Sequence, residues 1–210
     1  SKIPEVEPGD EVVVSDLSNF ENMVEACDGV NAIAHLGIAV PGRGAPRTLY
    51  NQMIMETNIK GTYNIFEAAR INNVKRVYLA STVWVYNGAP DVGVADETVP
   101  FYLNGAGHIY TSTKMACEMI CHNYSELYDI PFTVLRYGIP YGPRMREELL
   151  VPIFLKKAFN GEPLTIAGQG EQYRKFVYVK DIARAHLVGH SMGGAVGCLA
   201  ALFEPGRVAF

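Results

Sequence analysis

Short apolar runs alternate with longer segments of helical periodicity through the middle of the chain. The runs at 77–80 and 132–135 are bounded by polar residues, which is typical of strands buried on both faces of a parallel sheet. Between them, apolar residues recur at helical spacing from 110 to 124, and this helix is expected to stop before Pro131. Strand, helix, strand is the order of a parallel βαβ unit, so the pattern predicts an α/β fold.

Further elements are predicted on both sides of this unit. A capping box, Ser18-x-x-Glu21, indicates the start of a helix that ends near Cys27. A long helix is expected from about 49 to 70, and a loop with proline and glycine from 86 to 107. The remaining predicted elements are strands at 32–35, 164–166 and 176–179 and a helix at about 151–159.

The composition is that of an ordinary enzyme body. With 210 residues and 49% hydrophobic content, the chain can bury a sizeable core in one α/β domain with a small appendage. The net charge of −4 argues against nucleic acid or an anionic membrane as a partner. No apolar stretch approaches the ~20 residues of a membrane-spanning helix, and no signal peptide is visible. The four cysteines lack metal or redox spacing and the five histidines are scattered, so we expect no metal and a cytoplasmic location.

Tyr110 and Lys114 form a Tyr-x-x-x-Lys step on the predicted helix, and Thr82 follows the apolar run at 77–80. Residues four apart share one helix face, so the Lys114 ammonium can lie beside the Tyr110 phenol. A neighbouring cation and a hydroxyl donor such as Thr82 both favour the phenolate. The three residues therefore predict a base that takes a proton from a substrate alcohol, as hydride transfer to a nicotinamide requires. Thr82 is expected at the carboxyl end of its strand, where open α/β sheets bind ligands.

The order and spacing of several short segments is specific, although no single segment is decisive. Besides Tyr110 and Lys114, these segments are 14–17 (Val-Ser-Asp-Leu), 34–37 (Ala-His-Leu-Gly), 57–62 (Thr-Asn-Ile-Lys-Gly-Thr), 79–86, 135–143 and 174–181. Together they resemble the extended short-chain dehydrogenase/reductases, specifically the NAD-dependent epimerase/dehydratase family, and this resemblance implies a strand at 14–17. The resemblance covers about residues 10–186.

The resemblance implies a fold and an assembly. The fold is a Rossmann-like doubly wound parallel sheet with a small C-terminal substrate-binding region. We therefore divide the chain into an incomplete NAD-binding domain (1–140), a small substrate-binding region (141–185) and a tail (186–210). In the family, the long helix and the helix that carries the Tyr-Lys step pair with their copies, so we expect a homodimer.

The resemblance also implies catalytic roles. Tyr110 is the general base, Lys114 lowers its pKa while binding the nicotinamide ribose, and Thr82 donates its hydroxyl to the substrate. Arg174 matches the arginine that holds the diphosphate of a nucleotide sugar, a task that suits its planar fork. The expected substrate is a sugar, a nucleotide sugar or a similar polyol. Ile139 stands where the family has an asparagine, which removes one polar contact to such a diphosphate.

The cofactor implied by the resemblance is NAD. NAD is expected in place of NADP as the family default, because the residue that reads the 2′-position ends a strand that is not found in this sequence. The residues expected to bind it are Asp16 and Leu17 at the adenine, Leu36 and Gly37 beneath the cofactor, Tyr137 and Gly138 at the nicotinamide, and Tyr110 and Lys114 at the ribose.

The two ends of the sequence depart from the family pattern. No Gly-x-x-Gly-x-x-Gly turn precedes Asp16, so the unit that binds the pyrophosphate is absent from its expected place. In the tail, Gly189-x-Ser191-x-Gly193 resembles the nucleophile elbow of an α/β-hydrolase, but no histidine follows Ser191 to complete a triad. The tail also has the pattern of a β-turn-α-β unit, which predicts that it fills the vacant position in the sheet.

Three interpretations of the whole chain stay open. The first is an NAD-dependent epimerase/dehydratase-type oxidoreductase that uses Thr82, Tyr110 and Lys114. The second is a truncated or recombined fragment of such an enzyme, impaired because the Gly-rich loop is missing. The third is a serine hydrolase with Ser191 as its nucleophile. Cofactor binding separates the first two, and labelling of Ser191 by an organophosphonate tests the third.

Overall fold

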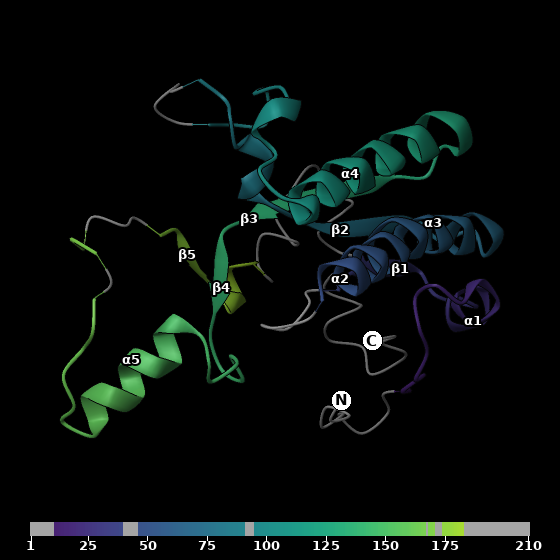
Figure 1. Ribbon diagram of the computed structural model, residues 1–210. Helices are drawn as coiled ribbons and strands as arrows, with labels where there is room; N and C mark the ends of the chain where they lie inside the picture. Colours follow the sequence, from purple (N-terminus) through teal and green to yellow (C-terminus); the bar gives the residue numbers. More distant parts are fainter. Residues whose placement is uncertain (1–10, 40–45, 91–94, 167, 171–173, 183–210) are drawn as a thin grey trace.

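A parallel sheet and the helices packed against it form the main body of the protein (Figure 1). The computed structural model describes residues 11–39, 46–90, 95–166, 168–170 and 174–182. The predictions made for the tail, including the Gly189-x-Ser191-x-Gly193 motif and the β-turn-α-β unit, lie outside these residues. None of the helices in the described ranges is long and apolar enough to cross a membrane.

The main sheet has three parallel strands in the order β1-β2-β3. They are β1 (Ala32–His35), β2 (Arg76–Thr82) and β3 (Phe132–Tyr137). The central strand β2 is buried along six of its seven residues, as expected for an apolar run covered on both faces. The predicted parallel α/β arrangement is confirmed. The register pairs Ser81 with Arg136 and Thr82 with Tyr137 at the carboxyl ends of β2 and β3.

The predicted long helix forms in three consecutive segments. They are α2 (Arg47–Ile54), a wide π-helical turn η1 (Met55–Lys60) and α3 (Gly61–Ile71). Asn58 lies buried in the wide turn, where its side chain accepts from the Ala39 N–H at 2.9 Å and donates to the Thr113 hydroxyl at 3.1 Å. Its carbonyl oxygen accepts from the Thr62 hydroxyl at 2.5 Å and from the Cys117 thiol at 3.2 Å. The turn thereby joins the long helix to the next one.

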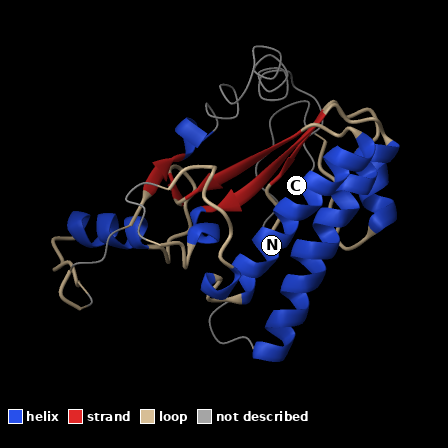
Figure 2. Ribbon diagram, turned by 90° about the horizontal axis from the view of Figure 1, so that it is seen from above, coloured by secondary structure: helices blue, strands red, loops and turns tan. Residues whose placement is uncertain are grey.

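The helix that carries the Tyr-Lys step is α4 (Ile109–Tyr128), and it ends before Pro131 as predicted. In Figure 2, the long helices lie along one side of the sheet. Helix α3 contacts β1 and β2, and α4 contacts β2 and β3. Between these layers the core is formed by buried side chains that include Phe66, Val77, Leu79 and Cys121. Burial of this apolar surface is the main force that holds α3 and α4 against the sheet.

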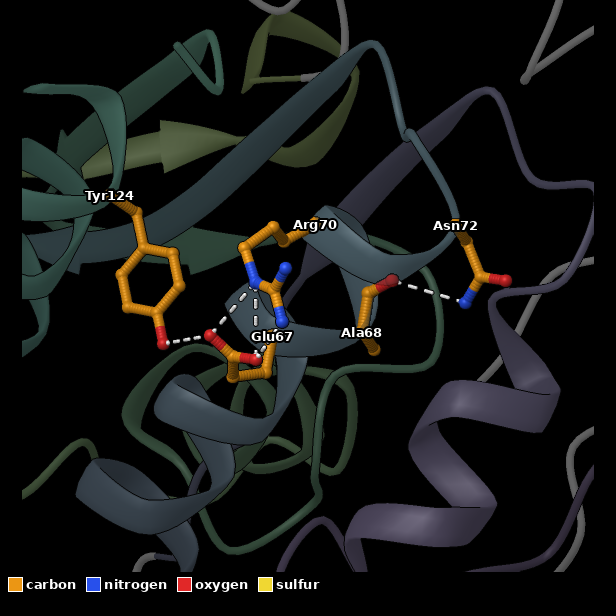
Figure 3. A network of polar contacts seen from close by, with 5 residues as sticks. All are labelled: Glu67, Ala68, Arg70, Asn72 and Tyr124. Atoms are coloured by element: carbon orange, nitrogen blue, oxygen red, sulfur yellow. Dashed lines mark hydrogen bonds and ion pairs between the residues drawn. The ribbon is translucent and has the colours of Figure 1, made fainter. Parts of the chain in front are cut away.

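Polar contacts also join α3 to α4 near the carboxyl ends of the two helices (Figure 3). The Tyr124 hydroxyl on α4 donates to a Glu67 carboxylate oxygen on α3 at 2.8 Å. Arg70 donates to the same carboxylate from one turn further along α3, with its shortest contact at 2.9 Å. Asn72 closes the end of α3 by donating to the Ala68 carbonyl oxygen at 3.0 Å. The Glu67 carboxylate therefore has partners on both helices.

The segment before the first helix differs from the prediction in two ways. Residues 14–17 form no strand, because Asp16 makes a turn in which its carboxylate accepts the Ser18 N–H at 2.8 Å and its carbonyl accepts the Asn19 N–H at 2.9 Å. Helix α1 (Phe20–Ala26) then begins one residue later than the capping box implied. Its cap is Asn19, whose side chain accepts the Asn22 N–H at 3.0 Å.

A second, smaller sheet follows the main one. It pairs β4 (Ile139–Tyr141) with β5 (Phe176–Tyr178) in parallel. Helix α5 (Leu150–Phe159) lies between them in the sequence, close to its predicted bounds. The strand predicted at 164–166 is wrong, since these residues pair with no strand of the described chain. Two short 3₁₀ helices, η2 (Val83–Tyr86) and η3 (Leu103–Gly105), precede α4.

Candidate active site

Three of the predicted site residues meet where β2 and β3 end beside the first turn of α4. Thr82 is the last residue of β2 and lies opposite Tyr137, the last residue of β3. Tyr110 is in the first turn of α4, and its phenol lies near the Thr82 side chain, whose hydroxyl acts to lower the pKa of the phenol. Thr82 also caps η2 by accepting the Trp84 N–H at 3.3 Å. The chain therefore leaves the sheet directly after Thr82, and the end of β2 forms part of the site.

Burial governs the electrostatics of Tyr110. It raises the pKa of the phenol, and the hydrogen bond from Thr82 partly offsets that rise. The Tyr137 phenol lies close enough that its pKa is raised by burial and also by Tyr110. The net direction for the Tyr110 pKa is upward, and Lys114 is not among the groups that lower it. An effect of Lys114 on Tyr110 stays a prediction.

Lys114 lies one turn further along α4 and is buried, with 4% of its surface exposed. Its ammonium donates a hydrogen bond to the Ala80 carbonyl oxygen at 2.5 Å, which ties α4 to the central strand. Burial lowers the pKa of this amine, and the neighbouring Cys117, Glu118 and Cys121 partly offset that effect. A buried lysine held beside a strand end is an uncommon arrangement, and perturbed ionisable groups of this kind cluster at functional sites.

Aromatic rings line the entrance to Tyr110. His108 precedes the first turn of α4 and caps it, since its Nδ1 accepts the Thr111 N–H at 3.2 Å. Its ring lies 4.9 Å from the ring of Trp84 and 5.8 Å from that of Tyr110, centroid to centroid. Trp84 is 47% exposed, so its ring is available to a ligand that reaches the site. Sequence reasoning missed both His108 and Trp84, although each lies two residues from a predicted catalytic residue.

The residues predicted to hold the adenine side of a cofactor lie at the amino-terminal part of the described chain. Asp16 uses its carboxylate to cap the Ser18 N–H, and this hydrogen bond lowers its pKa. The Leu17 side chain fills the space beside two glycines, since a Cβ on Gly37 would lie 2.4 Å from Leu17 Cδ1 and one on Gly61 would lie 2.8 Å from Leu17 Cβ. Leu36 is exposed just beyond β1. The structure thus assigns packing and turn roles to Leu17 and Asp16.

Gly138 and Arg174 belong to the region that joins the two sheets. A Cβ on Gly138 would lie 2.3 Å from the Lys175 carbonyl oxygen, so only glycine permits this approach of the backbone. The same carbonyl accepts the Ile139 N–H at 2.8 Å, which aligns β4 with the segment before β5. Arg174 is exposed two residues before β5. Gly138 therefore links the end of β3, where Tyr137 lies, to the segment that carries Arg174.

A buried ion pair beneath the site was not predicted. Glu118 on α4 and Arg136 on β3 contact each other at 2.7 Å, and the Ser81 hydroxyl donates to the same carboxylate. Two signals in the sequence could have indicated it. Glu118 follows Lys114 by four residues and so shares its helix face. Arg136 lies inside a predicted buried strand, where an unpaired charge is costly.

The fold and the arrangement of Thr82, Tyr110 and Lys114 define a Rossmann-like α/β protein of the short-chain dehydrogenase/reductase type. The sequence model that describes the NAD dependent epimerase/dehydratase family matches residues 2–195 of this chain. The chain belongs to this family, which confirms the resemblance seen in the sequence.

Individual relatives are nucleotide-sugar enzymes. The chain is 31% identical over 172 residues to UDP-glucuronate 4-epimerase of Thermodesulfobacterium geofontis, covering 80% of this chain and 51% of that protein. UDP-N-acetylglucosamine 4-epimerase of Methanobrevibacter ruminantium, solved with UDP-N-acetylmuramic acid, has a TM-score of 0.68 at 32% identity, covering 81% of this chain and 54% of that one. UDP-glucuronic acid 4-epimerase of Bacillus cereus, solved with UDP-glucuronic acid and NAD, has a TM-score of 0.68 at 26% identity, covering 84% and 55%. The chain spans about half the length of these relatives.

Proposed function

We propose that this chain contributes the catalytic residues of an NAD-dependent epimerase/dehydratase-type enzyme that acts on a nucleotide sugar. The observation that carries the proposal is the approach of the Tyr110 phenol to the Thr82 side chain at the carboxyl end of the central strand, with the buried Lys114 one turn further along α4. Ligands of open α/β sheets bind at this edge. A phenol, a hydroxyl donor and an ammonium group are the set needed to move a proton between the protein and a sugar hydroxyl.

Each of the three residues has a defined task in this proposal. Tyr110, in its deprotonated phenolate form, takes the proton from a substrate hydroxyl. The Thr82 hydroxyl donates a hydrogen bond to the phenolate oxygen of Tyr110. This donation favours the phenolate, in agreement with the effect of Thr82 in lowering the Tyr110 pKa. Lys114 supplies a positive charge that stabilises the phenolate and binds ribose hydroxyls. Tyr137 lies beside Thr82 on the neighbouring strand and so borders the site.

The residues present fit the nicotinamide end of NAD. A buried ammonium and two half-buried phenols lie near the end of β2, and this donor set suits a ribose and a carboxamide. The residues that would hold NAD are Tyr110, Lys114, Tyr137 and Gly138 at this end, Leu36 and Gly37 below it, and Asp16 and Leu17 at the adenine. When bound, NAD supplies hydride exchange with the substrate carbon.

The substrate class is proposed from the relatives and from two features of this chain. The relatives described above act on UDP-linked sugars or were solved with them. Arg174, exposed beside β5, has the fork that binds a diphosphate bidentately. Trp84 offers an exposed ring, separated from the Tyr110 ring by that of His108, against which the apolar face of a sugar ring can pack. We therefore propose a nucleoside diphosphate sugar over a free polyol.

Calorimetric titration with NAD⁺ and NADH is the first test, followed by incubation with UDP-glucose, UDP-glucuronic acid and UDP-N-acetylglucosamine. Micromolar cofactor binding and interconversion of one sugar with its C4 epimer support the proposal. Tyr110→Phe is the matched control, since it keeps the ring and removes the proton acceptor. Absence of binding at millimolar cofactor overturns the proposal for this chain and favours a fragment that carries the catalytic residues without a cofactor site.

We further propose that the protein is a homodimer formed through α3 and α4. These helices lie side by side (Figure 1), and large apolar or aromatic side chains on them are exposed, namely Tyr63, Met119, Leu127 and Tyr128. Exposed apolar side chains gathered on one pair of helices indicate an interaction surface. Burial against a second copy would cover them, and symmetric pairing is the commonest form of assembly.

A further inference from the structure

A bidentate ion pair is buried where α4 crosses the ends of β2 and β3. The Arg136 guanidinium contacts the Glu118 carboxylate through Nη2 at 2.7 Å and through Nε at 3.1 and 3.2 Å. The Glu118 side chain is 1% exposed and that of Arg136 is 19% exposed. The Ser81 hydroxyl donates to Oε1 of the same carboxylate, which also accepts from Arg136 Nε. The carboxylate is therefore fully paired, as a buried charge requires.

Each member of this cluster is tied in the sequence to a residue of the proposed active site. Ser81 directly precedes Thr82, and Arg136 directly precedes Tyr137. The register of the sheet places Ser81 beside Arg136, so the cluster spans both strands at their last two residues. Glu118 follows Lys114 by one helical turn, on the same face of α4. The pair thus joins β2, β3 and α4 immediately next to Thr82, Tyr137 and Lys114.

Arg136 extends the cluster to the turn that follows Thr82. Its Nη1 donates to the Tyr86 hydroxyl at 2.8 Å, and Tyr86 is the last residue of η2. The guanidinium also lies 5.1 Å from the ring centroids of Tyr86 and Phe101. An arginine held by a carboxylate, a hydroxyl and two aromatic faces has little freedom to move.

The same carboxylate acts on the charge of Lys114. Burial lowers the pKa of the Lys114 amine, whereas Cys117, Glu118 and Cys121 on α4 act to raise it. On β1, the buried His35 also interacts with Lys114, but its own pKa is lowered to about 3, so it is neutral at physiological pH. On β2, the Ala80 carbonyl accepts from the ammonium. Burial raises the pKa values of the two thiols, so they stay protonated and uncharged. Among these neighbours of Lys114, Glu118 therefore supplies the negative charge.

From this geometry we infer that Glu118 and Arg136 are positioning residues for the active site: the pair fixes Thr82, Tyr137 and Lys114 relative to one another and supplies the negative charge that accompanies the Lys114 ammonium. The inference rests on the proposed function for its effect on turnover. Its electrostatic part concerns the protein alone and is measurable without cofactor or substrate.

Two variants separate this role from simple stabilisation of the fold. Glu118→Gln removes the carboxylate charge and keeps the shape of the side chain, so the pKa of Lys114 is expected to fall by about one unit. Arg136→Gln removes the partner and leaves the carboxylate, so the pKa of Lys114 is expected to stay or rise. The measurement is NMR titration of isotopically labelled lysine in the full chain, with the Lys114 signal assigned by its loss in Lys114→Arg. If both variants move the Lys114 pKa in the same direction, or neither moves it, the electrostatic role is overturned.

Ser81→Ala provides a milder variant in case either charge variant fails to fold. It removes one hydroxyl from the cluster beside Thr82. Turnover is expected to fall about tenfold with KM for the nucleotide sugar within about twofold, because the substrate contacts stay and the alignment of Thr82 is lost. Ser81→Thr, which keeps the hydroxyl, is expected to restore turnover. Unchanged turnover in Ser81→Ala overturns the positioning role. Should the wild-type chain show no turnover, the proposed function fails, and the lysine titration still decides the inference.

Discussion

The Thr82 side chain lies near the Tyr110 phenol across the junction between β2 and α4. The Thr82 hydroxyl opposes the effect of burial on the phenol, which otherwise disfavours the phenolate. Two residues separated by 27 intervening positions therefore meet only because the strand ends where the helix begins. The strength of Tyr110 as a base depends on this contact.

Removing the phenol oxygen should stop the reaction without disturbing the site. In Tyr110→Phe, turnover of the nucleotide sugar is expected to fall by a factor of about 10² to 10⁴, the range for loss of a positioned acid or base. The affinity for NAD should change by less than about threefold, because Lys114 and Tyr137 stay in place. Steady-state kinetics and calorimetry measure the two quantities. A variant that retains full turnover would show that another group takes the proton.

Thr82→Val should change the pH dependence of the reaction. The substitution replaces a hydroxyl by a methyl group of similar size, so the hydrogen bond that lowers the Tyr110 pKa is lost and that pKa should rise. The rising, alkaline-directed limb of the pH–rate profile is expected to move to higher pH, and turnover at neutral pH to fall about a hundredfold. Thr82→Ser serves as the control, since it keeps the donor. An unshifted profile in Thr82→Val contradicts the assignment of Thr82.

His35 should make the protein less stable as the pH falls below about 6.5. Its ring is buried on β1 and accepts or donates a hydrogen bond at the Thr62 hydroxyl, and burial, followed by the charge of Lys114, lowers its pKa to about 3. The unfolded chain has an ordinary histidine pKa of about 6.5 and binds the proton first. This contribution to stability is therefore complete above the unfolded pKa and is lost as pH falls towards the folded value.

The expected loss between pH 7.5 and pH 5 is about 2 kcal/mol, measured by urea unfolding. Carboxyl groups with lowered pKa values, such as those of Asp16 and Glu67, add a pH dependence only at lower pH, because their unfolded pKa values lie near 4. His35→Gln should flatten the profile over this interval, whereas His122→Gln, at an exposed position on α4, should leave it unchanged. Equal slopes in the wild type and His35→Gln would rule out the buried histidine as the cause.

Gly61→Ala tests the close packing of α3 against the segment before α1. Alanine in place of glycine normally stabilises a helix by about 1 kcal/mol. Here the new Cβ would lie 2.8 Å from Leu17 Cβ, and the Leu17 carbonyl is held by the Asn64 amide at 2.8 Å, so the loop cannot easily withdraw. We expect a net loss of about 1–3 kcal/mol in the free energy of unfolding. In a Leu17→Gly background the same change should be neutral or stabilising, since the obstructing atom is gone.

Tyr63→Arg tests the proposed dimer. A charge placed among the exposed aromatic side chains of α3 and α4 would be buried on association, which is costly without a partner. Light scattering after gel filtration should show the wild type as a dimer and the variant as a monomer. Leu103→Arg is the matched control, because Leu103 is 75% exposed on η3 and lies outside these helices. A monomeric wild type would contradict the proposal directly.

The main body of the fold could be predicted from the sequence because its elements are strongly periodic or strongly apolar. Strand β2, helix α4 and strand β3 all form within a few residues of their predicted bounds. The same pattern placed Thr82 at a strand end and Tyr110 and Lys114 on one helix. The meeting of these residues follows from general rules for parallel sheets, so it needed no further information.

The errors arose where a local pattern depends on a distant partner. The family resemblance implies a strand at residues 14–17, but Asp16 satisfies nearby N–H groups by itself and closes a turn. Asn19 outcompetes Ser18 as a helix cap, and both are good capping residues. The Glu118–Arg136 pair depends on the register between β2 and β3 and on the rotation of α4. Neither quantity can be derived from the local pattern of charges.

Because of the wide turn Met55–Lys60, the alignment of the site depends on the number of residues in the long helix. A π turn accommodates one residue more than an α turn. Deleting one residue there would let the helix run through in regular form, with both halves keeping their faces, but would remove the widened backbone in which Asn58 lies. Asn58 would then leave Thr113, its partner on the helix of Tyr110. An enzyme altered in this way could keep every catalytic side chain and a well-formed helix, and still lose the alignment on which they depend.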